Sequence, residues 1–422
     1  MAARDAAVTA GQAEIAKALT RACGDVRGGG RLAASPASTD EAAALLRAAA
    51  GLGLAVVVQG GGSRLSWGSQ PSRCDLVVDT ARLTAVLEHA SGDLVARVQA
   101  GARMGDVAAE LARAGQEIAL DVPALATAGG VVASGLAGPR RLRYGTPRDL
   151  LIGITVVRAD GTVAKAGGKV VKNVAGYDLG KLFAGSAGTL GLITEATFRL
   201  HPLPAARAWV TAGYQAAPDA CDAVAAAANS PLTASAVELS RAEPGAPVRV
   251  GVLLEGSAEG VAARAARMAG LLGPASVAAG PPDWWPLAPA AGPGETLVQV
   301  SFWVSALNRV LDAVDTAAAK TGLRPAVAGS AGAGLLYARL GPGPQRAGAA
   351  ADFVAVLRAA VAGERGGVAV LAVPAAVQAG LAPHGGMTGP VPGLALMRAV
   401  KDRFDPEHRL APGRFPDFTV GA

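Results

Sequence analysis

Three glycine-rich stretches in the first half of the chain carry its most informative chemistry. The first is Gly60-Gly61-Gly62-Ser63, which follows an apolar run at residues 54–58 that is typical of a buried β-strand. Consecutive glycines leave backbone N–H groups open to an anion, because no Cβ stands in the way. The stretch lacks both the Gly-Lys-Ser/Thr of a Walker A loop and the GxGxxG that opens a dinucleotide-binding helix. At this point a tight turn and a phosphate-binding loop are equally good interpretations.

The other two stretches extend the same pattern. Residues 121–135 combine Gly129 and Gly130 with the hydroxyl of Thr127, and residues 168–194 mix glycines with Lys, Asn and Tyr. A glycine-rich crossover would explain the second stretch alone about as well as a binding site would. No metal-ligand, Ser/His/Asp or Cys/His pattern accounts for the glycines. Together they predict a site that wraps an extended, flat, phosphorylated ligand.

Composition excludes several other functions. The chain has 422 residues, enough for two or three domains, and its net charge of +6 (39 basic minus 33 acidic residues) is spread along it without a basic run. A nucleic-acid surface is therefore not expected. Cys23, Cys74 and Cys221 lie far apart and form no CxxC pair, which argues against a disulfide framework, a zinc site or an iron–sulfur cluster.

The chain also lacks the sequence features of a membrane or secreted protein. Residues 1–19 contain four charged side chains, so no signal-peptide core is expected there. Elsewhere no apolar stretch reaches the roughly 20 residues that span a bilayer. We therefore expect a cytoplasmic protein that reaches the inner membrane only through partner subunits.

The pattern of elements predicts an α+β protein with a boundary near the proline pair at residues 202 and 204. Before it, apolar runs predict strands separated by a few helices. After it, Ala-rich helical segments such as 216–229 alternate with strands such as 248–255. We expect one domain at 1–204 with its core at about 30–204, a cap domain at 205–395, and a C-terminal segment at 396–422 that returns to the first domain.

The order of motifs resembles the FAD-binding domain of the vanillyl-alcohol oxidase and p-cresol methylhydroxylase (PCMH) superfamily. The motifs are GGGS at 60–63, AGARMGDV at 100–107, TAGGVVASGLAGPRR at 127–141, and a segment at 158–204 that contains KNVAGYDL and GTLGLIT. Within that superfamily, GPRR and KNVAGYDL are most similar to the smaller flavin subunit of bacterial glycolate oxidase. The tail at 397–415 is similar to the closing segment of the family. The resemblance implies a two-lobed PCMH-type FAD-binding domain with an α+β cap.

The resemblance also implies which residues hold FAD. The pyrophosphate would meet the backbone of the first loop, the flavin and pyrophosphate would be lined by the second stretch, and the ribityl–adenosine side would lie by the residues that follow it. A main-chain contact is implied near the end of GTLGLIT. The implied FAD-binding residues are Gly60, Gly61, Gly62, Ser63, Pro123, Thr127, Gly129, Gly130, Ser134, Gly138, Tyr144, Gly145, Asp149 and Ile193.

Departures from the family pattern bear on catalysis. Residues 59–65 contain no histidine of the kind that attaches FAD in some members, so we expect noncovalent binding. The chain has four histidines and no HxH pair, and Ala187 stands where many catalytic members have Glu. We expect no metal site, and His384 is the one histidine kept as a candidate catalytic residue. The cations considered for stabilising a reduced, anionic flavin are Lys169, Lys172, Arg140 and Arg141.

Three functions follow as hypotheses. The first is the FAD-binding subunit of a complex that oxidises glycolate to glyoxylate, with a catalytic flavin subunit and an iron–sulfur subunit as partners. The second is a stand-alone FAD-dependent dehydrogenase of D-lactate-like 2-hydroxy acids, which would require residues such as Arg339, Tyr337 and His384 to meet in the cap. The third is a non-catalytic structural subunit with a degenerate flavin site.

Overall fold

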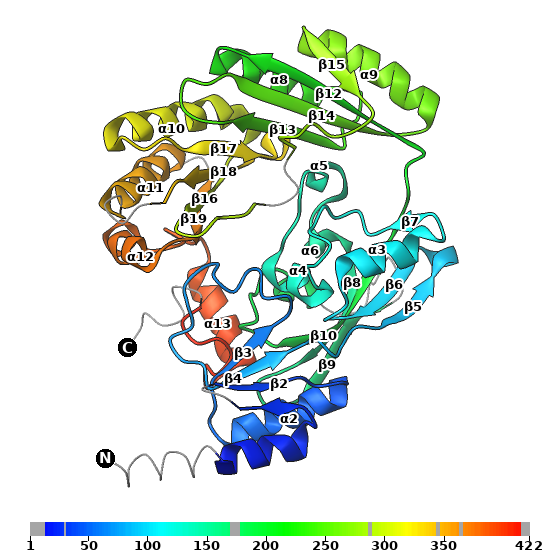
Figure 1. The fold of residues 1–422 in the computed structure, drawn as a ribbon, viewed down its shortest axis with the longest axis vertical. Coiled ribbons are helices and arrows are strands. Elements are labelled where there is room, and N and C mark those ends of the chain that lie inside the picture. Colours follow the sequence, from blue (N-terminus) through cyan, green and yellow to red (C-terminus); the bar gives the residue numbers. More distant parts are fainter. Residues whose placement is uncertain are drawn as a thin grey trace.

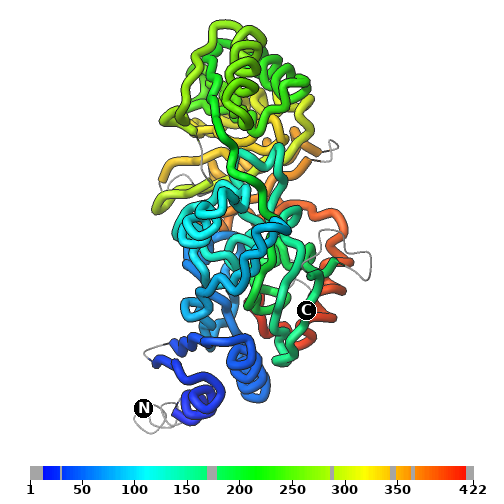
Figure 2. Tube along the Cα trace, turned by 90° about the vertical axis from the view of Figure 1, so that its right-hand side faces the viewer, coloured from blue at the N-terminus to red at the C-terminus, as the bar shows by residue number. Residues whose placement is uncertain are grey.

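The molecule is elongated, with an N-terminal part at one end and a sheet-and-helix cap at the other (Figures 1 and 2). The computed structural model describes residues 13–28, 31–168, 178–285, 289–342, 347–362 and 366–414. We use "N-terminal part" for the described residues up to 205 and "cap" for those from 206 to 393. Helices and strands are mixed in both, which confirms the expected α+β class. No helix within the described ranges is long and apolar enough to cross a bilayer.

The first lobe of the N-terminal part is a small sheet packed with helix α2 and a preceding helix at residues 13–22. Helix α2 (Thr39–Gly51) begins at Ser38, whose hydroxyl accepts a hydrogen bond from the Glu41 backbone N–H, and it buries Leu45 and Leu46 against the sheet. The strand order is β1-β2-β4-β3, with β2, β4 and β3 parallel. The strands are β1 (Val26–Arg27), β2 (Leu32–Ala34), β4 (Leu76–Asp79) and β3 (Val56–Gln59).

The second lobe is an antiparallel sheet of five strands in the order β5-β6-β10-β8-β9. Its core includes Val98, Val131, Phe183 and Phe198. The strands are β5 (Val86–Ala90), β6 (Val95–Gln99), β10 (Leu192–Arg199), β8 (Leu151–Val157) and β9 (Val163–Gly167), and a two-stranded ladder joins β7 (Gln116–Glu117) to β11 (His201–Pro202). The helices are α3 (Met104–Ala112), α4 (Ala128–Ser134), α5 (Arg141–Tyr144), α6 (Pro147–Leu150) and α7 (Gly180–Phe183).

The cap is built on an eight-stranded sheet in the order β15-β12-β14-β13-β17-β18-β16-β19. The strands are β12 (Ala206–Tyr214), β13 (Ala236–Arg241), β14 (Val248–Gly256), β15 (Ala275–Ala278), β16 (Thr296–Ser301), β17 (Ala326–Gly329), β18 (Leu335–Leu340) and β19 (Gly367–Ala372). The helices are α8 (Ala217–Asn229), α9 (Ala258–Leu272), α10 (Leu307–Thr321), α11 (Ala347–Val361) and the shorter α12 (Ala375–Leu381).

The two faces of this sheet differ in character. Because side chains alternate along a strand, Val237 and Leu239 join the core beneath helices α8–α11, whereas Glu238 and Ser240 point to the other face. Figure 1 shows the helices on the outer side of the sheet and the N-terminal part below its other side. The helix-free face therefore meets the N-terminal part.

The end of the described chain returns to the N-terminal part. Helix α13 (Leu394–Phe404) packs on the second lobe, where Phe404 meets Phe183 edge-on and Val400 lies against the same core. The Lys401 ammonium is buried there and donates to the carbonyls of Thr189 (2.7 Å) and Leu410 (3.0 Å) while pairing with Asp405 (2.6 Å). This contact fixes the C-terminal segment against the backbone of residue 189, which is distant in the sequence.

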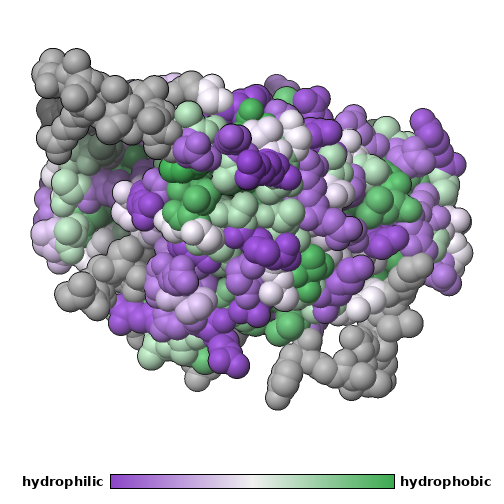
Figure 3. Space-filling view, turned by 90° about the horizontal axis from the view of Figure 1, so that it is seen from below, coloured by the Kyte–Doolittle hydropathy of each residue, from purple (hydrophilic) through white to green (hydrophobic). Residues whose placement is uncertain are grey.

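The surface at the N-terminal end is mixed in character. Figure 3 looks at the molecule from below and shows hydrophobic residues scattered singly or in small groups among hydrophilic ones. Scattered apolar residues of this kind are normal for a protein surface. The chemically distinctive features of the described residues lie instead between the two parts of the molecule.

Candidate functional site

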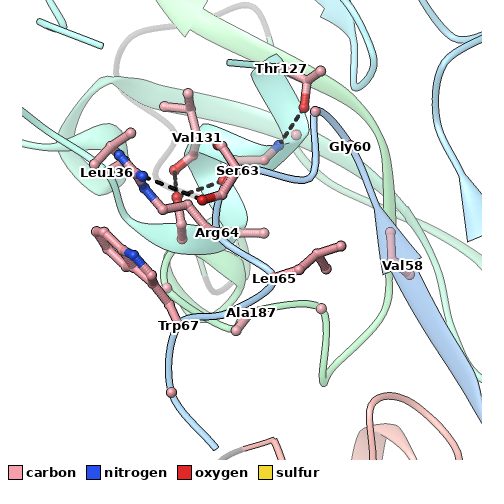
Figure 4. Close-up of a pocket in the computed structure, with 18 of the residues that line it drawn as sticks. Val58, Gly60, Ser63, Arg64, Leu65, Trp67, Thr127, Val131, Leu136 and Ala187 are labelled. Carbon is pink, nitrogen blue, oxygen red and sulfur yellow. Dashed lines mark hydrogen bonds between the residues drawn. The ribbon is translucent and has the colours of Figure 1, made fainter. Parts of the chain in front are cut away.

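A cavity of about 350 Å³ lies where the glycine stretches meet. One wall is the loop after β3, residues 60–68, and a second is α4 with the residues just before it. A third wall comes from residues 185–193, and the cap closes the cavity with Gln299 and residues 369–371. Figure 4 shows the first three walls around a common space. Segments more than 300 residues apart in sequence thus form one site.

The glycines of this site are required by close packing. A Cβ on Gly60 would collide with the Thr127 hydroxyl, and a Cβ on Gly129 would lie 2.7 Å from the Ala100 Cβ. Gly62 has φ +74°, a left-handed conformation that other residues adopt rarely. The loop can therefore run close to α4 and present its backbone to the space between them. Such a cradle fits the phosphates of FAD.

Two hydroxyls hold the second wall in place. The Thr127 hydroxyl caps α4 by accepting a hydrogen bond from the Gly130 backbone N–H at 3.3 Å, and the Ser134 hydroxyl donates to the Gly130 carbonyl at 2.7 Å. Figure 4 draws the bond of the Thr127 hydroxyl as a dashed line. These side chains position the wall, so the groups offered to a ligand are largely backbone.

Two arginines that the sequence analysis did not single out, Arg64 and Arg414, also line this site. The Arg64 guanidinium stacks over Trp67, with its Cζ 4.3 Å from the ring centroid, and burial lowers its pKa. Arg414 comes from the C-terminal end and donates to the carbonyls of Leu65 (3.1 Å) and Arg64 (2.8 Å). Positive charge next to a glycine loop favours an anionic ligand. In the sequence, the only indication of a role for Arg64 is its position directly after the GGGS motif.

The implied FAD-binding residues fall into two groups. The residues that line the cavity are Gly60, Gly61, Gly62, Ser63, Thr127, Gly129, Gly130, Ser134 and Ile193. The residues outside its lining are Pro123, Gly138, Tyr144, Gly145 and Asp149. The assignment of both groups of residues to FAD stays a prediction.

The second group has local structural contacts. The Asp149 carboxylate accepts from the backbone N–H (2.8 Å) and hydroxyl (2.9 Å) of Thr146, which caps α6. A Cβ on Gly145 would lie 2.6 Å from Asp149, and the Tyr144 hydroxyl donates to Glu255 at 3.2 Å. The Pro123 carbonyl accepts from the Ala126 N–H at 2.9 Å. The contacts of Tyr144, Gly145 and Asp149 shape the turn between α5 and β8 and its contact with the cap, whereas that of Pro123 belongs to the loop before α4.

Arg140 is engaged in a buried ion cluster that joins the two parts of the molecule. Its guanidinium lies 2.7 Å from carboxylate oxygens of both Glu117 and Asp121 and 3.3 Å from Glu255 of the cap. Burial alone would lower the Arg140 pKa, but hydrogen bonding to Glu117 and the charges of these carboxylates raise it overall. The Arg140 guanidinium is thus already paired with carboxylates at the contact between the N-terminal part and the cap. Lys169 and Lys172, with most of KNVAGYDL, lie outside the described residues.

A second cavity, of about 450 Å³, lies between residues 137–141 and the helix-free face of the cap sheet. Glu238 lines it and is fully buried, and neither of its carboxylate oxygens has a hydrogen-bond partner among the described residues. Burial raises its pKa to about 8, against the influence of the Ser330 hydroxyl and the Arg141 guanidinium. Glu238 is therefore a neutral carboxylic acid near neutral pH.

Tyr337 links the two cavities. It pairs across the sheet with Gln299, which lines the first cavity, while Tyr337 itself lines the second. Burial raises the Tyr337 pKa, and interactions with the Arg141 and Arg64 guanidiniums oppose that shift. Because Arg64 belongs to the first cavity, the two spaces are close neighbours.

His384 lies apart from both cavities. Tyr337 and Arg339 line the second cavity, but His384 belongs to a short turn of helix at 382–384, where its backbone carbonyl accepts from Arg358. The structure therefore brings together two of the three residues considered for a stand-alone active site. Among the described residues, no group of three or more His, Cys, Asp or Glu side chains is arranged to hold a metal ion.

Comparison with known proteins identifies two segments. Residues 31–167 match the model of the FAD binding domain, and residues 386–415 match that of the C-terminal domain of FAD linked oxidases. The first match contains the first two glycine stretches, and the second contains α13 and Arg414. Both matched segments therefore contribute residues to the lining of the first cavity.

Similar proteins agree with these matches. The chain is 35% identical to glycolate oxidase subunit GlcD of Bacillus subtilis over 187 residues, which are 43% of this chain and 39% of that one. It is 37% identical to glycolate oxidase subunit GlcE of Escherichia coli over 154 residues, 36% of this chain and 43% of that one. A solved structure of xylooligosaccharide oxidase from Myceliophthora thermophila superposes with a TM-score of 0.69 at 16% identity, covering 95% of this chain and 99% of that one.

These likenesses differ in what they establish. The structural likeness, at low identity, concerns the fold alone. The chain spans about two fifths of the length of the curated relatives it matches. The family models support FAD binding: one segment of the chain matches the FAD binding domain and another matches the C-terminal domain of FAD linked oxidases.

Proposed function

We propose that this chain is the FAD-binding redox subunit of a complex that oxidises glycolate to glyoxylate. The observation that carries the proposal is the first cavity, in which three glycine stretches, Arg64 and the cap surround one space. Two relatives named as glycolate oxidase subunits support the choice of substrate.

The residues of this chain would hold FAD as follows. The backbone of residues 60–63 would bind the pyrophosphate, with Arg64 supplying positive charge, and FAD held there would accept electrons from the α-carbon of a hydroxy acid. Gln299 and Leu371 of the cap would cover the site. The Leu371 carbonyl accepts from the Gly68 N–H at 2.7 Å, so the cap and the loop are directly joined on that side. Such closure would limit access of water to the reacting groups.

Partner subunits would complete the electron path. The chain has only three cysteines, and Cys23, Cys74 and Cys221 are far apart in sequence, so its own donors cannot form a four-cysteine cluster site. We therefore propose an iron–sulfur subunit as electron acceptor and a second flavin subunit as the main site of hydroxy-acid oxidation. Association with the inner membrane would occur through these partners.

One observation favours the alternative of a stand-alone 2-hydroxy-acid dehydrogenase. The second cavity places Tyr337, Arg339 and Glu238 beside the first, as a substrate site would require. Glu238, however, is protonated near neutral pH, and a carboxylic acid in that form cannot accept a proton from the substrate. The retained glycine cradle argues against a purely structural subunit.

An anaerobic reduction experiment tests the proposal. The FAD-loaded full chain is mixed with glycolate or D-lactate at about pH 7, and the flavin absorbance is followed with and without the partner subunits. We expect the flavin of the isolated chain to stay oxidised and to be reduced in the complex. Rapid bleaching of the isolated chain by either acid would instead identify a stand-alone dehydrogenase.

A further inference from the structure

The last described residues, 409–414, lie along the first lobe and reach the glycine loop. The Val56 N–H donates to the Arg409 carbonyl at 2.8 Å. Leu410 pairs with Val56 in parallel and is buried in the core of the first lobe. The segment therefore lies as an extended chain beside β3, the strand that leads into the loop at residues 60–72. We call residues 409–414 the C-terminal strap.

The C-terminal strap holds this loop at two places. The Ser72 N–H and hydroxyl both donate to the Pro412 carbonyl, at 2.8 and 3.2 Å. Nearer the GGGS motif, the Arg414 guanidinium donates to the carbonyls of Arg64 at 2.8 Å and Leu65 at 3.1 Å. A guanidinium is planar and rigid, so two such bonds fix the direction of both peptide groups. Because this turn directly follows the GGGS motif, the bonds restrain the backbone that the cofactor would meet.

Arg414 carries a charge that no carboxylate of the described residues balances. It is buried, with 7% of its surface exposed, and its two acceptors are neutral carbonyls. The described lining of the first cavity contains no Asp or Glu, and its charged members are Arg64 and Arg414. Burial lowers the pKa of both arginines. A buried charge is costly unless an opposite charge lies close to it, so the cavity is suited to an anionic group such as a pyrophosphate.

We infer that Arg414 is a positioning residue of the cofactor site and that the C-terminal strap and FAD stabilise each other. Arg414 holds the turn after GGGS in the conformation that receives the phosphates, and the phosphates offset the buried charges of Arg64 and Arg414. The inference rests on the FAD site of the proposed function, but not on its substrate or its partner subunits. Coupling of this kind is reciprocal: the factor that the strap adds to FAD affinity is the factor by which FAD stabilises the closed strap.

Titration of the flavin-free full chain with FAD tests the first half of the inference. We expect Arg414→Gln to bind FAD about tenfold more weakly, the loss that follows when charge-assisted hydrogen bonds are removed. Arg414→Lys keeps the charge without the paired donors and should lie between the two. Arg73→Gln is the matched control, because Arg73 also donates to a backbone carbonyl, that of Gly53 at 3.0 Å, but is exposed beside Asp75. It should bind FAD as the unmodified chain does.

Thermal unfolding separates positioning of the cofactor from general stabilisation of the fold. FAD raises the unfolding midpoint of a chain that binds it, by an amount that depends on its affinity. At a fixed FAD concentration, the rise should be smaller in Arg414→Gln than in the unmodified chain. If Arg414 had only a structural role, its replacement would lower the midpoints with and without FAD equally and leave FAD affinity unchanged. That result would overturn the inference.

Limited digestion with trypsin tests the reverse coupling in the unmodified chain, so it does not depend on the folding of a variant. Cleavage after Arg414 releases a peptide that begins at Phe415, which mass spectrometry detects. Saturating FAD should slow this cleavage by the same factor, about tenfold, while cleavage after the exposed Arg113 should not change. Equal cleavage rates at Arg414 in a chain that does bind FAD would overturn this inference alone. A chain that takes up no FAD would overturn the proposed function as well.

Discussion

Replacing Gly60 with alanine is expected to lower the affinity for FAD by about tenfold or more, which corresponds to about 1.4 kcal/mol. A Cβ at this position collides with the Thr127 hydroxyl, so Thr127 must move. Its hydroxyl then leaves the Gly130 N–H that it caps, and the loop and α4 separate. The measurement is a titration of flavin-free protein with FAD, followed by flavin fluorescence.

The control for this change is Gly51→Ala at the end of α2. No atom lies within 4 Å of a Cβ built there, and the residue is exposed. Alanine also favours helix over glycine, so this variant should fold and bind FAD normally. If both variants bound FAD with unchanged affinity, the glycine loop would not be the cofactor cradle.

Replacing Lys401 with methionine is expected to destabilise the protein by about 3 kcal/mol, in the range measured when one partner of a buried ion pair is removed. The Lys401 ammonium is buried, and without it the Asp405 carboxylate keeps, among the described residues, only the backbone N–H donors of Arg409 (3.1 Å) and Leu410 (2.7 Å). The Thr189 carbonyl also loses a donor. Urea unfolding followed by circular dichroism measures the change.

Lys181→Met provides the matched comparison. Lys181 pairs with Asp178 at 3.3 Å, but both side chains are about half exposed, and exposed pairs contribute at most about 1 kcal/mol. Its unfolding midpoint should stay close to that of the unmodified chain. A similar small effect from both variants would show that the buried pair does not anchor the C-terminal segment.

The sequence pointed to many of the residues that line the first cavity because they lie in short local motifs. The first two glycine stretches each adjoin a strand or a helix that a local sequence pattern indicates. Nine of the implied FAD-binding residues consequently line one space. The family resemblance supplied their common ligand, and the domain matches agree with it.

The remainder of the site depends on contacts that no local pattern encodes. Arg414 reaches the loop at residues 64–65 only because the C-terminal segment crosses back, and Gln299 reaches the cavity only through the docking of the cap. The capping pattern of Thr146 and Asp149 was readable in the sequence and offers a structural explanation for Asp149. Glu238 is the one acidic residue of strand β13. The alternation of side chains along the strand does not tell which part of the molecule packs against the face of the sheet that carries Glu238.

The most direct test of the account is the flavin content of the purified full chain. One FAD per chain is predicted, with the visible spectrum of a bound flavin and with the whole of the FAD released into solution when the protein is precipitated by acid, as noncovalent binding requires. A colourless protein that takes up no added FAD would contradict the central claim that the glycine-lined cavity is an FAD site.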